Sequence, residues 1–237
     1  MGLSCFSRCK LEYRFCTGMQ YPFGNGGHQW LLYDWDQRRV IDVLVPGPDD
    51  VQETFVLEAV VKFIDHLPSD VVQVTLSKGG NLVSSSSDLT LDRSWAPFYP
   101  ARTDFPRRVL TTRRRDLTEL ERLGVGVDLT PAPDSSHSGG TRVVAFKYYL
   151  TENDVANSRH ETNCVLRLRH PNIVPFDSLV VDRIENVDRV VGFTTRYIPG
   201  GTLSENKSRV FKLKYLRELI SVGNPPASLL GHFDNLE

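Results

Sequence analysis

The sequence predicts a mixed α+β protein with two folded units. Short runs of β-branched and aromatic residues recur along the chain, as expected for strands, and two segments have the apolar spacing of amphipathic helices. Between the two halves, residues 79–116 carry clusters of Gly, Ser, Pro and Arg, which are typical of a linker. The 237 residues suffice for two small domains.

Composition limits the partners and the compartment. The formal net charge of −1 provides no general attraction to nucleic acid or to an anionic membrane, and no apolar run approaches the ~18 residues of a membrane span. We therefore expect neither nucleic acid nor membrane as a partner. The four cysteines lack metal-ligand spacing, which favours a reduced, intracellular and cytoplasmic protein. The arginine-rich stretch leaves a nuclear location open.

The first half predicts a small β-β-α-β unit over residues 28–78, preceded by a poorly ordered N-terminus over residues 1–27. The run "HQWLLYDWDQRRVIDVLV" indicates two strands around a polar turn. A helix follows from about Asp50, with Asp50 and Glu53 in capping-box spacing, and "DVVQVTLS" is the last strand. Apolar residues at helical spacing form one stripe on this helix: Val51, Phe55, Val56, Ala59, Val60, Phe63 and Ile64.

In the second half, the run "RVVAFKYYL" (142–150) places one lysine, Lys147, inside a strand-like apolar segment. A buried lysine loses hydration and needs a partner anion. The alternative is an edge strand whose lysine extends outward to water. In the helical segment that follows, Glu161 shares a face with Val165 and Leu168. We therefore expect Lys147 to pair with Glu161 between strand and helix.

Such a pair is better suited to binding than to stability. The desolvation of two charges can cancel their attraction, whereas a lysine with spare N–H donors can bind phosphate oxygens. Upstream, Gly124 and Gly126 allow backbone N–H groups to approach a phosphate closely.

Residues 117–222 resemble the N-terminal lobe of eukaryotic protein kinases. The motifs that resemble this family are, in order along the chain, "GVG", "VAFK", "RHPNIVPF", "TTRYIPGGTL" and "FKLKYLRELISV". Their pattern is similar to that of the divergent protein kinase-like proteins of fungi. The resemblance implies an N-lobe of antiparallel sheet plus αC helix over 117–203. It also implies a truncated C-lobe, with a stub and a divergent tail over 204–237.

The resemblance also implies an ATP site. Lys147 would bind phosphate, Glu161 would be its αC partner, and Gly124 and Gly126 would cover the phosphates. The adenine would meet residues of the lysine strand and the hinge: Ala145, the gatekeeper Thr195, the carbonyl of Arg196 and the N–H of Ile198.

Three departures from the family pattern limit the activity. Leu129 occupies the third glycine position, and the separation between Lys147 and Glu161 is short for the family. Neither the H-x-D-x-x-x-x-N loop nor D-F-G is found, although phosphoryl transfer depends on both; "GHFDN" at 231–235 is the nearest candidate. We expect no catalytic residues, no metal ligands and no bound Mg²⁺.

These observations predict a Ser/Thr-type protein kinase-like protein that retains the ATP-binding lobe and is inactive as given. One alternative is a non-catalytic pseudokinase or scaffold that binds protein partners through the N-terminal unit or the hinge surface. A kinase of small molecules, such as an aminoglycoside or choline, is a further alternative.

Overall fold

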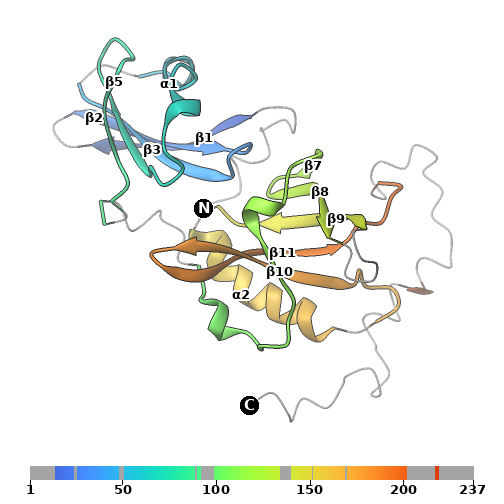
Figure 1. Cartoon of the computed structure of the whole chain (residues 1–237). Helices are drawn as coiled ribbons and strands as arrows, with labels where there is room; N and C mark the ends of the chain where they lie inside the picture. Colours follow the sequence, from blue (N-terminus) through green and yellow to red (C-terminus); the bar gives the residue numbers. More distant parts are fainter. Residues whose placement is uncertain are drawn as a thin grey trace. The chain divides into compact units, whose positions relative to one another are not determined.

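The computed structural model describes residues 14–23, 26–47, 51–88, 90–91, 99–133, 140–150, 152–168, 170–201 and 217–218. In these residues the fold is mixed α+β, with two sheets and the helices α1 and α2. The chain divides into two compact units: unit 1 contains residues 1–98 with the short segments 124–126 and 150–155, and unit 2 contains the rest of the chain from residue 99 onward. Each unit contains one of the sheets (Figure 1), and the fold class therefore agrees with the sequence-based expectation.

Unit 1 is built on a five-stranded sheet in the order β1-β2-β3-β4-β5. Helix α1 (Glu53–Val60) and the short 3-10 helix η2 (Ile64–His66) connect β3 to β4, and these two strands run parallel. The other neighbouring strands are antiparallel. The strands are β1 (Phe15–Phe23), β2 (Gly27–Asp34), β3 (Arg39–Val45), β4 (Gln73–Leu76) and β5 (Leu82–Ser86).

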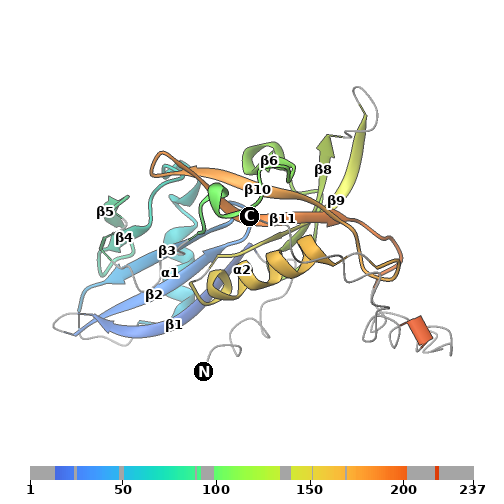
Figure 2. The same ribbon diagram turned by 90° about the horizontal axis from the view of Figure 1, so that it is seen from below.

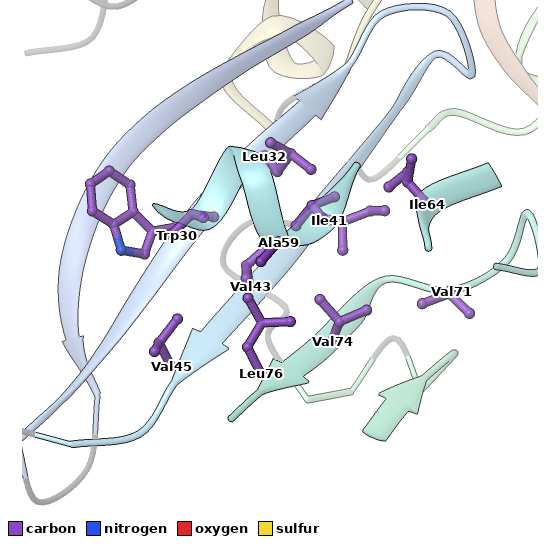
Figure 3. Close-up of a cluster of buried hydrophobic side chains, with 12 residues drawn as sticks. Trp30, Leu32, Ile41, Val43, Val45, Ala59, Ile64, Val71, Val74 and Leu76 are labelled. Atoms are coloured by element: carbon purple, nitrogen blue, oxygen red, sulfur yellow. The ribbon is translucent and has the colours of Figure 1, made fainter. Parts of the chain in front are cut away.

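The core of unit 1 lies between α1 and one face of the sheet (Figure 3). Alternate residues of β2 and β3 point into it because side chains of a strand alternate between its two faces. Val56, Ala59 and Val60 of α1 fill the other side. The cluster consists of Trp30, Leu32, Ile41, Val43, Val45, Val56, Ala59, Val60, Ile64, Val71, Val74 and Leu76.

Strand β1 (Phe15–Phe23) corrects the expectation of disorder for its own residues, whereas residues 1–13 lie outside the described part of the chain. Its backbone pairs along β2, with an irregularity between Thr17 and Gln20. Gly26 lies in the connection between these two strands and has φ of 93°. A glycine is needed there because its backbone is left-handed. Gly26 therefore marks a turn between strands.

The cap expected for α1 also differs. Asp50 lies outside the described residues, and Gln52 at the N-cap position makes no side-chain capping hydrogen bond. The carboxylate of Glu53 instead accepts a hydrogen bond from the hydroxyl of Thr17 on β1. Glu53 thus connects the first turn of the helix to the sheet.

The segment 79–116, expected to be a linker, contributes to both sheets. The serine-rich run forms β5 at the edge of the first sheet, where Ser84 and Ser85 pair with Thr75 and Val74. This strand has mostly exposed side chains, so it lacks the apolar alternation by which strands are recognised. Near the other end, Thr111–Arg113 form β6 of the second sheet.

Three arginines of this segment contact other residues of the fold. The Arg102 guanidinium donates to the backbone carbonyls of Phe105 and Val109. Arg113 forms a two-bond contact with Asp188, and Arg114 contacts Asp182. These three contacts are not expected of a linker, whereas the side chain of Arg115 is 86% exposed.

Unit 2 is built on a six-stranded sheet in the order β6-β10-β11-β9-β8-β7. Helix α2 (Glu152–Arg167) follows β9 and lies beside β10 and β11 in both ribbon views (Figures 1 and 2). The remaining strands are β7 (Glu121–Gly124), β8 (Val127–Pro133), β9 (Thr141–Tyr148), β10 (Phe176–Ile184) and β11 (Val187–Arg196). Short 3-10 helices, η3 (Arg102–Asp104) and η4 (Arg114–Asp116), flank β6.

A small apolar cluster lies in unit 2. Leu179 and Val181 of β10, Val190 of β11 and Phe105 are buried in it, and Leu166 of α2 packs against them. The helix is thus attached to the sheet by its C-terminal turn. Within the described part of the chain, no helix is both long enough and apolar enough to cross a membrane.

Candidate functional site

Strand β9 places Lys147 on the face of the sheet that carries α2. Val144, Phe146 and Tyr148 are buried, and alternation puts Lys147 and Ala145 on the opposite face. In the antiparallel register, Lys147 lies opposite Val127 of β8 and Phe193 of β11.

Ala145 lies two residues away on the same face as Lys147. It is opposite Leu129 of β8 and Thr195 of β11, and residues directly opposite in a sheet share a face. Three of the predicted site residues, Ala145, Lys147 and Thr195, are therefore brought together on one surface.

Lys147 and Glu161 form the expected ion pair. The Nζ of Lys147 lies 2.5 Å from the Oε1 of Glu161 on α2. The other carboxylate oxygen, Oε2, accepts a hydrogen bond of 3.0 Å from the Tyr149 hydroxyl. The ammonium also lies 5.8 Å from the centroid of the Tyr149 ring, within the range of a cation–π contact.

The pair is more exposed than the sequence predicts. Both side chains retain 38% of their solvent exposure, whereas the apolar strand predicted a poorly solvated lysine. The reason lies in α2: its buried side chains include Ser158 and Thr162, and Glu161 sits at the margin of that face. Leu168, expected to pack beside Glu161, follows the end of the helix and is 44% exposed.

This exposure matters chemically. An ammonium has three N–H donors, and one of them is directed to Glu161. Because the side chain remains partly in water, the other donors can reach an anion from solution. The carboxylate fixes the direction of the lysine, and the arrangement suits the binding of a phosphate oxygen.

The two predicted glycines lie in the connection between β7 and β8. Gly124 is the last residue of β7, and Gly126 follows in the turn with φ of 68°. The next residue, Val127, is the one opposite Lys147. A Cβ added to Gly124 would meet nothing within 4 Å, so the backbone there is open to approach.

The predicted hinge residues lie at the end of β11. Arg196 is the last residue of the strand, and its N–H donates to the carbonyl of Pro175 at 3.1 Å. Two residues on, the side chain of Ile198 is 59% exposed. The resemblance implies that adenine would contact the carbonyl of Arg196 and the N–H of Ile198. The hydrogen bond from the Arg196 N–H to Pro175 uses neither of these groups.

The segment after α2 contacts the stretch that resembles the next helix. The Nδ1 of His170 accepts a hydrogen bond from the N–H of Asn172, and the side-chain amide of Asn172 donates to the carbonyl of Glu218 at 3.2 Å. Arg217 and Glu218 are helical. The candidate "GHFDN" (231–235) and the rest of the tail lie outside the described residues.

Sequence reasoning missed Tyr149 and Tyr99. The Tyr99 hydroxyl donates to the backbone carbonyl of Tyr149 at 2.5 Å, although Tyr99 was expected to belong to a linker. A signal for Tyr149 was present, because a residue two positions after Lys147 lies on the same face of a strand. No such signal exists for Tyr99.

Within the described residues, no group of three or more His, Cys, Asp or Glu side chains could hold a metal ion. The chain matches no model of a known protein family, and no curated protein matches it.

Proposed function

We propose that the chain is a divergent protein kinase-like protein whose second unit binds ATP through Lys147. The observation that carries the proposal is the ion pair between Lys147 and Glu161 at 2.5 Å. In protein kinases the phosphate-binding lysine lies on the third strand, and its glutamate lies on the αC helix. Counted from β7, the strand that precedes the glycine connection, β9 is the third strand, and α2 follows it.

The surroundings of the pair support a nucleotide over a smaller anion. Ala145, Leu129 and Thr195 lie opposite one another beside Lys147, so the surface next to the ammonium contains small and apolar side chains. A base could lie against such a surface while the phosphates reach the lysine, because ligand sites combine apolar walls with a few placed polar groups.

The proposal covers binding and not phosphoryl transfer. The sequence contains neither D-F-G nor H-x-D-x-x-x-x-N, and the residues of these motifs hold Mg²⁺ and orient the acceptor in protein kinases. We therefore expect ATP to bind with similar affinity in the presence of Mg²⁺ and of a chelator, because Lys147 contacts the phosphates directly.

The existence of unit 1 favours a second role for the chain, as a protein interaction module. This unit has its own sheet and its own apolar core, while Lys147, Glu161 and the hinge residues belong to unit 2. Unit 1 would then recruit a protein partner, and unit 2 would respond to nucleotide.

Thermal unfolding with ATP tests the binding proposal. ATP at about fifty times its dissociation constant should stabilise the wild-type chain by about 2 kcal/mol. Lys147→Ala should remove this stabilisation; the fold should persist because Glu161 keeps its hydrogen bond from Tyr149. Lys62→Ala, at an exposed lysine of unit 1, is the matched control and should respond as wild type does. Absence of any shift at millimolar ATP would contradict the proposal.

A further inference from the structure

We propose that Tyr149 is a positioning residue that holds Glu161 beside Lys147 before any nucleotide binds. The inference gives the ATP site proposed above a preformed state, and its role in binding rests on that proposal. The geometry on which it depends is a chain of contacts from Tyr99 through Tyr149 and Glu161 to Lys147.

The ion pair by itself is poorly suited to fix the helix. Both charged side chains are 38% exposed, and exposed pairs contribute little because water and salt compete with the attraction. Rotation of the glutamate about its side-chain bonds would also separate the two groups. A further contact is therefore needed if Lys147 is to be held in one direction.

Tyr149 supplies that contact. Its hydroxyl donates to Oε2 of Glu161 at 3.0 Å while Lys147 binds Oε1. With both oxygens bound from the strand, the carboxylate cannot rotate without breaking a bond. The Tyr149 side chain is rigid and buried, at 6% exposure, so the hydroxyl itself has few alternative positions.

The backbone of Tyr149 is fixed in turn. Its carbonyl accepts the 2.5 Å hydrogen bond from Tyr99, and its N–H donates to the carbonyl of Val191 at 3.4 Å. Tyr99 is attached to β11 because Arg189 donates to its carbonyl at 3.1 Å. Residues outside the kinase-like segment thus help to position the pair within it.

Tyr148 provides a matched control. It is the same residue type at the neighbouring position, it is also buried, and its hydroxyl contacts Asp128 at 3.3 Å on the other face of the strand. Tyr149→Phe and Tyr148→Phe each remove one phenol oxygen, but only the first removes a contact with Glu161. A general loss of stability affects both variants, whereas a loss of positioning affects one.

The experiment measures acylation of Lys147 by an amine-reactive reagent, without ATP, with the exposed Lys62 as internal reference. An ammonium bonded to a carboxylate is shielded, so the rate reports how often the pair is open. Tyr149→Phe should accelerate labelling of Lys147 about two- to fivefold, as expected for loss of one hydrogen bond to a partly exposed carboxylate. Tyr148→Phe should leave the rate unchanged, and Tyr99→Phe should have a smaller effect than Tyr149→Phe.

The same variants are then titrated with ATP. The dissociation constant of Tyr149→Phe should rise by up to about fivefold, because apparent affinity falls with the fraction of competent protein. Equal labelling of Lys147 in wild type and Tyr149→Phe would overturn the inference. If labelling rises as expected but wild-type Lys147 is not protected by ATP, Tyr149 positions the pair and the ATP proposal is the one that fails.

Discussion

Helices α1 and α2 are attached to their sheets in different ways. Helix α1 places Val56, Ala59 and Val60 in the core of unit 1, each at 2% exposure or less. In α2, by contrast, the fully buried side chains among residues 157–167 are Ser158 and Thr162. Helix α1 is thus held by apolar burial, whereas the described side chains of α2, at residues 157–167, bury polar groups and pack Leu166 against the unit 2 cluster.

The magnitudes of these contacts explain the difference. Burying one valine side chain stabilises by about 1.5–3 kcal/mol, whereas a half-exposed ion pair contributes about 0–1 kcal/mol. Residues 157–167 of α2 therefore gain less from apolar burial than α1 does. A helix that must present a carboxylate to a partly solvated lysine cannot bury that side of itself in an apolar core.

Truncation of one core leucine in each unit should have the largest effect. Leu32 of unit 1 and Leu179 of unit 2 are both completely buried, so each change to alanine removes the same atoms. Each variant should lose about 2–5 kcal/mol of unfolding free energy. Hydrogen exchange followed by peptide should locate the loss, with Leu32→Ala accelerating exchange in β2–β4 and Leu179→Ala in β10 and β11.

The two leucine variants also separate the proposed functions. Protection of Lys147 by ATP should survive Leu32→Ala and be weakened by Leu179→Ala, because Leu166 of α2 packs on the Leu179 cluster. Val61→Ala, at a side chain that is 57% exposed, controls for shortening a residue without a core defect. Equal acceleration of exchange in both units by Leu32→Ala would mean that the comparison between them does not hold.

Apolar patterns made much of the architecture of both units predictable from the sequence. Alternation in β2 and β3 and the stripe on α1 identify the residues that the core contains. Strands β1 and β5 could not be predicted in this way. Strand β1 has no regular apolar alternation and ends near a glycine turn. Strand β5 is a serine run that is stabilised by backbone pairing at the edge of the sheet.

For the candidate site, the pairing of charges was predictable and its solvation was not. A lysine within an apolar strand and a glutamate on the apolar face of the following helix each need a partner of opposite charge, so the sequence predicts that Lys147 and Glu161 pair. Their exposure depends on where α2 meets the sheet, which spacing along the chain does not specify. The contact from Tyr99 to Tyr149 joins residues fifty positions apart, and no local pattern marks such a pair.

Adding a methyl group at Gly192 should have the second largest effect on the free energy of unfolding. A Cβ at this residue of β11 would lie 2.1 Å from the backbone carbonyl oxygen of Lys147. Neither strand can yield by a side-chain rotation, so β9 and β11 must separate locally. Gly192→Ala should lower the unfolding free energy by about 1–3 kcal/mol and accelerate acylation of Lys147. Thermal unfolding and labelling measure the two effects.

Gly124→Ala is the matched control for this change. A Cβ at Gly124 meets nothing within 4 Å, so the same substitution should be tolerated, and the less flexible unfolded chain should offset part of any loss of stability. A Gly192→Ala variant as stable as Gly124→Ala would show that the close packing of β9 against β11 does not determine the position of the lysine.

Removing one acid-sensitive ion pair from either unit should have the smallest effect on stability. Each unit has an aspartate, at least partly exposed, that is bound by an arginine: Arg14 lies 2.6 Å from Asp65, and Arg113 lies 2.8 Å from Asp188. The hydrogen bond from the arginine lowers the pKa of each aspartate below its ordinary value. Because the folded pKa is the lower one, each contact stabilises at pH values above about 3.9 and is lost as the pH falls through the folded pKa.

Asp65→Asn and Asp188→Asn should therefore destabilise the protein slightly at pH 7 and converge with wild type near pH 2. Denaturant unfolding across this range should show a shallower acid limb for each variant, and added salt should reduce the differences because both contacts are partly exposed to solvent. Asp188 accepts two hydrogen bonds from Arg113, so Asp188→Asn should lower the stability of unit 2. An unchanged acid limb in Asp188→Asn would mean that the contact between β6 and β11 adds no pH-dependent stability.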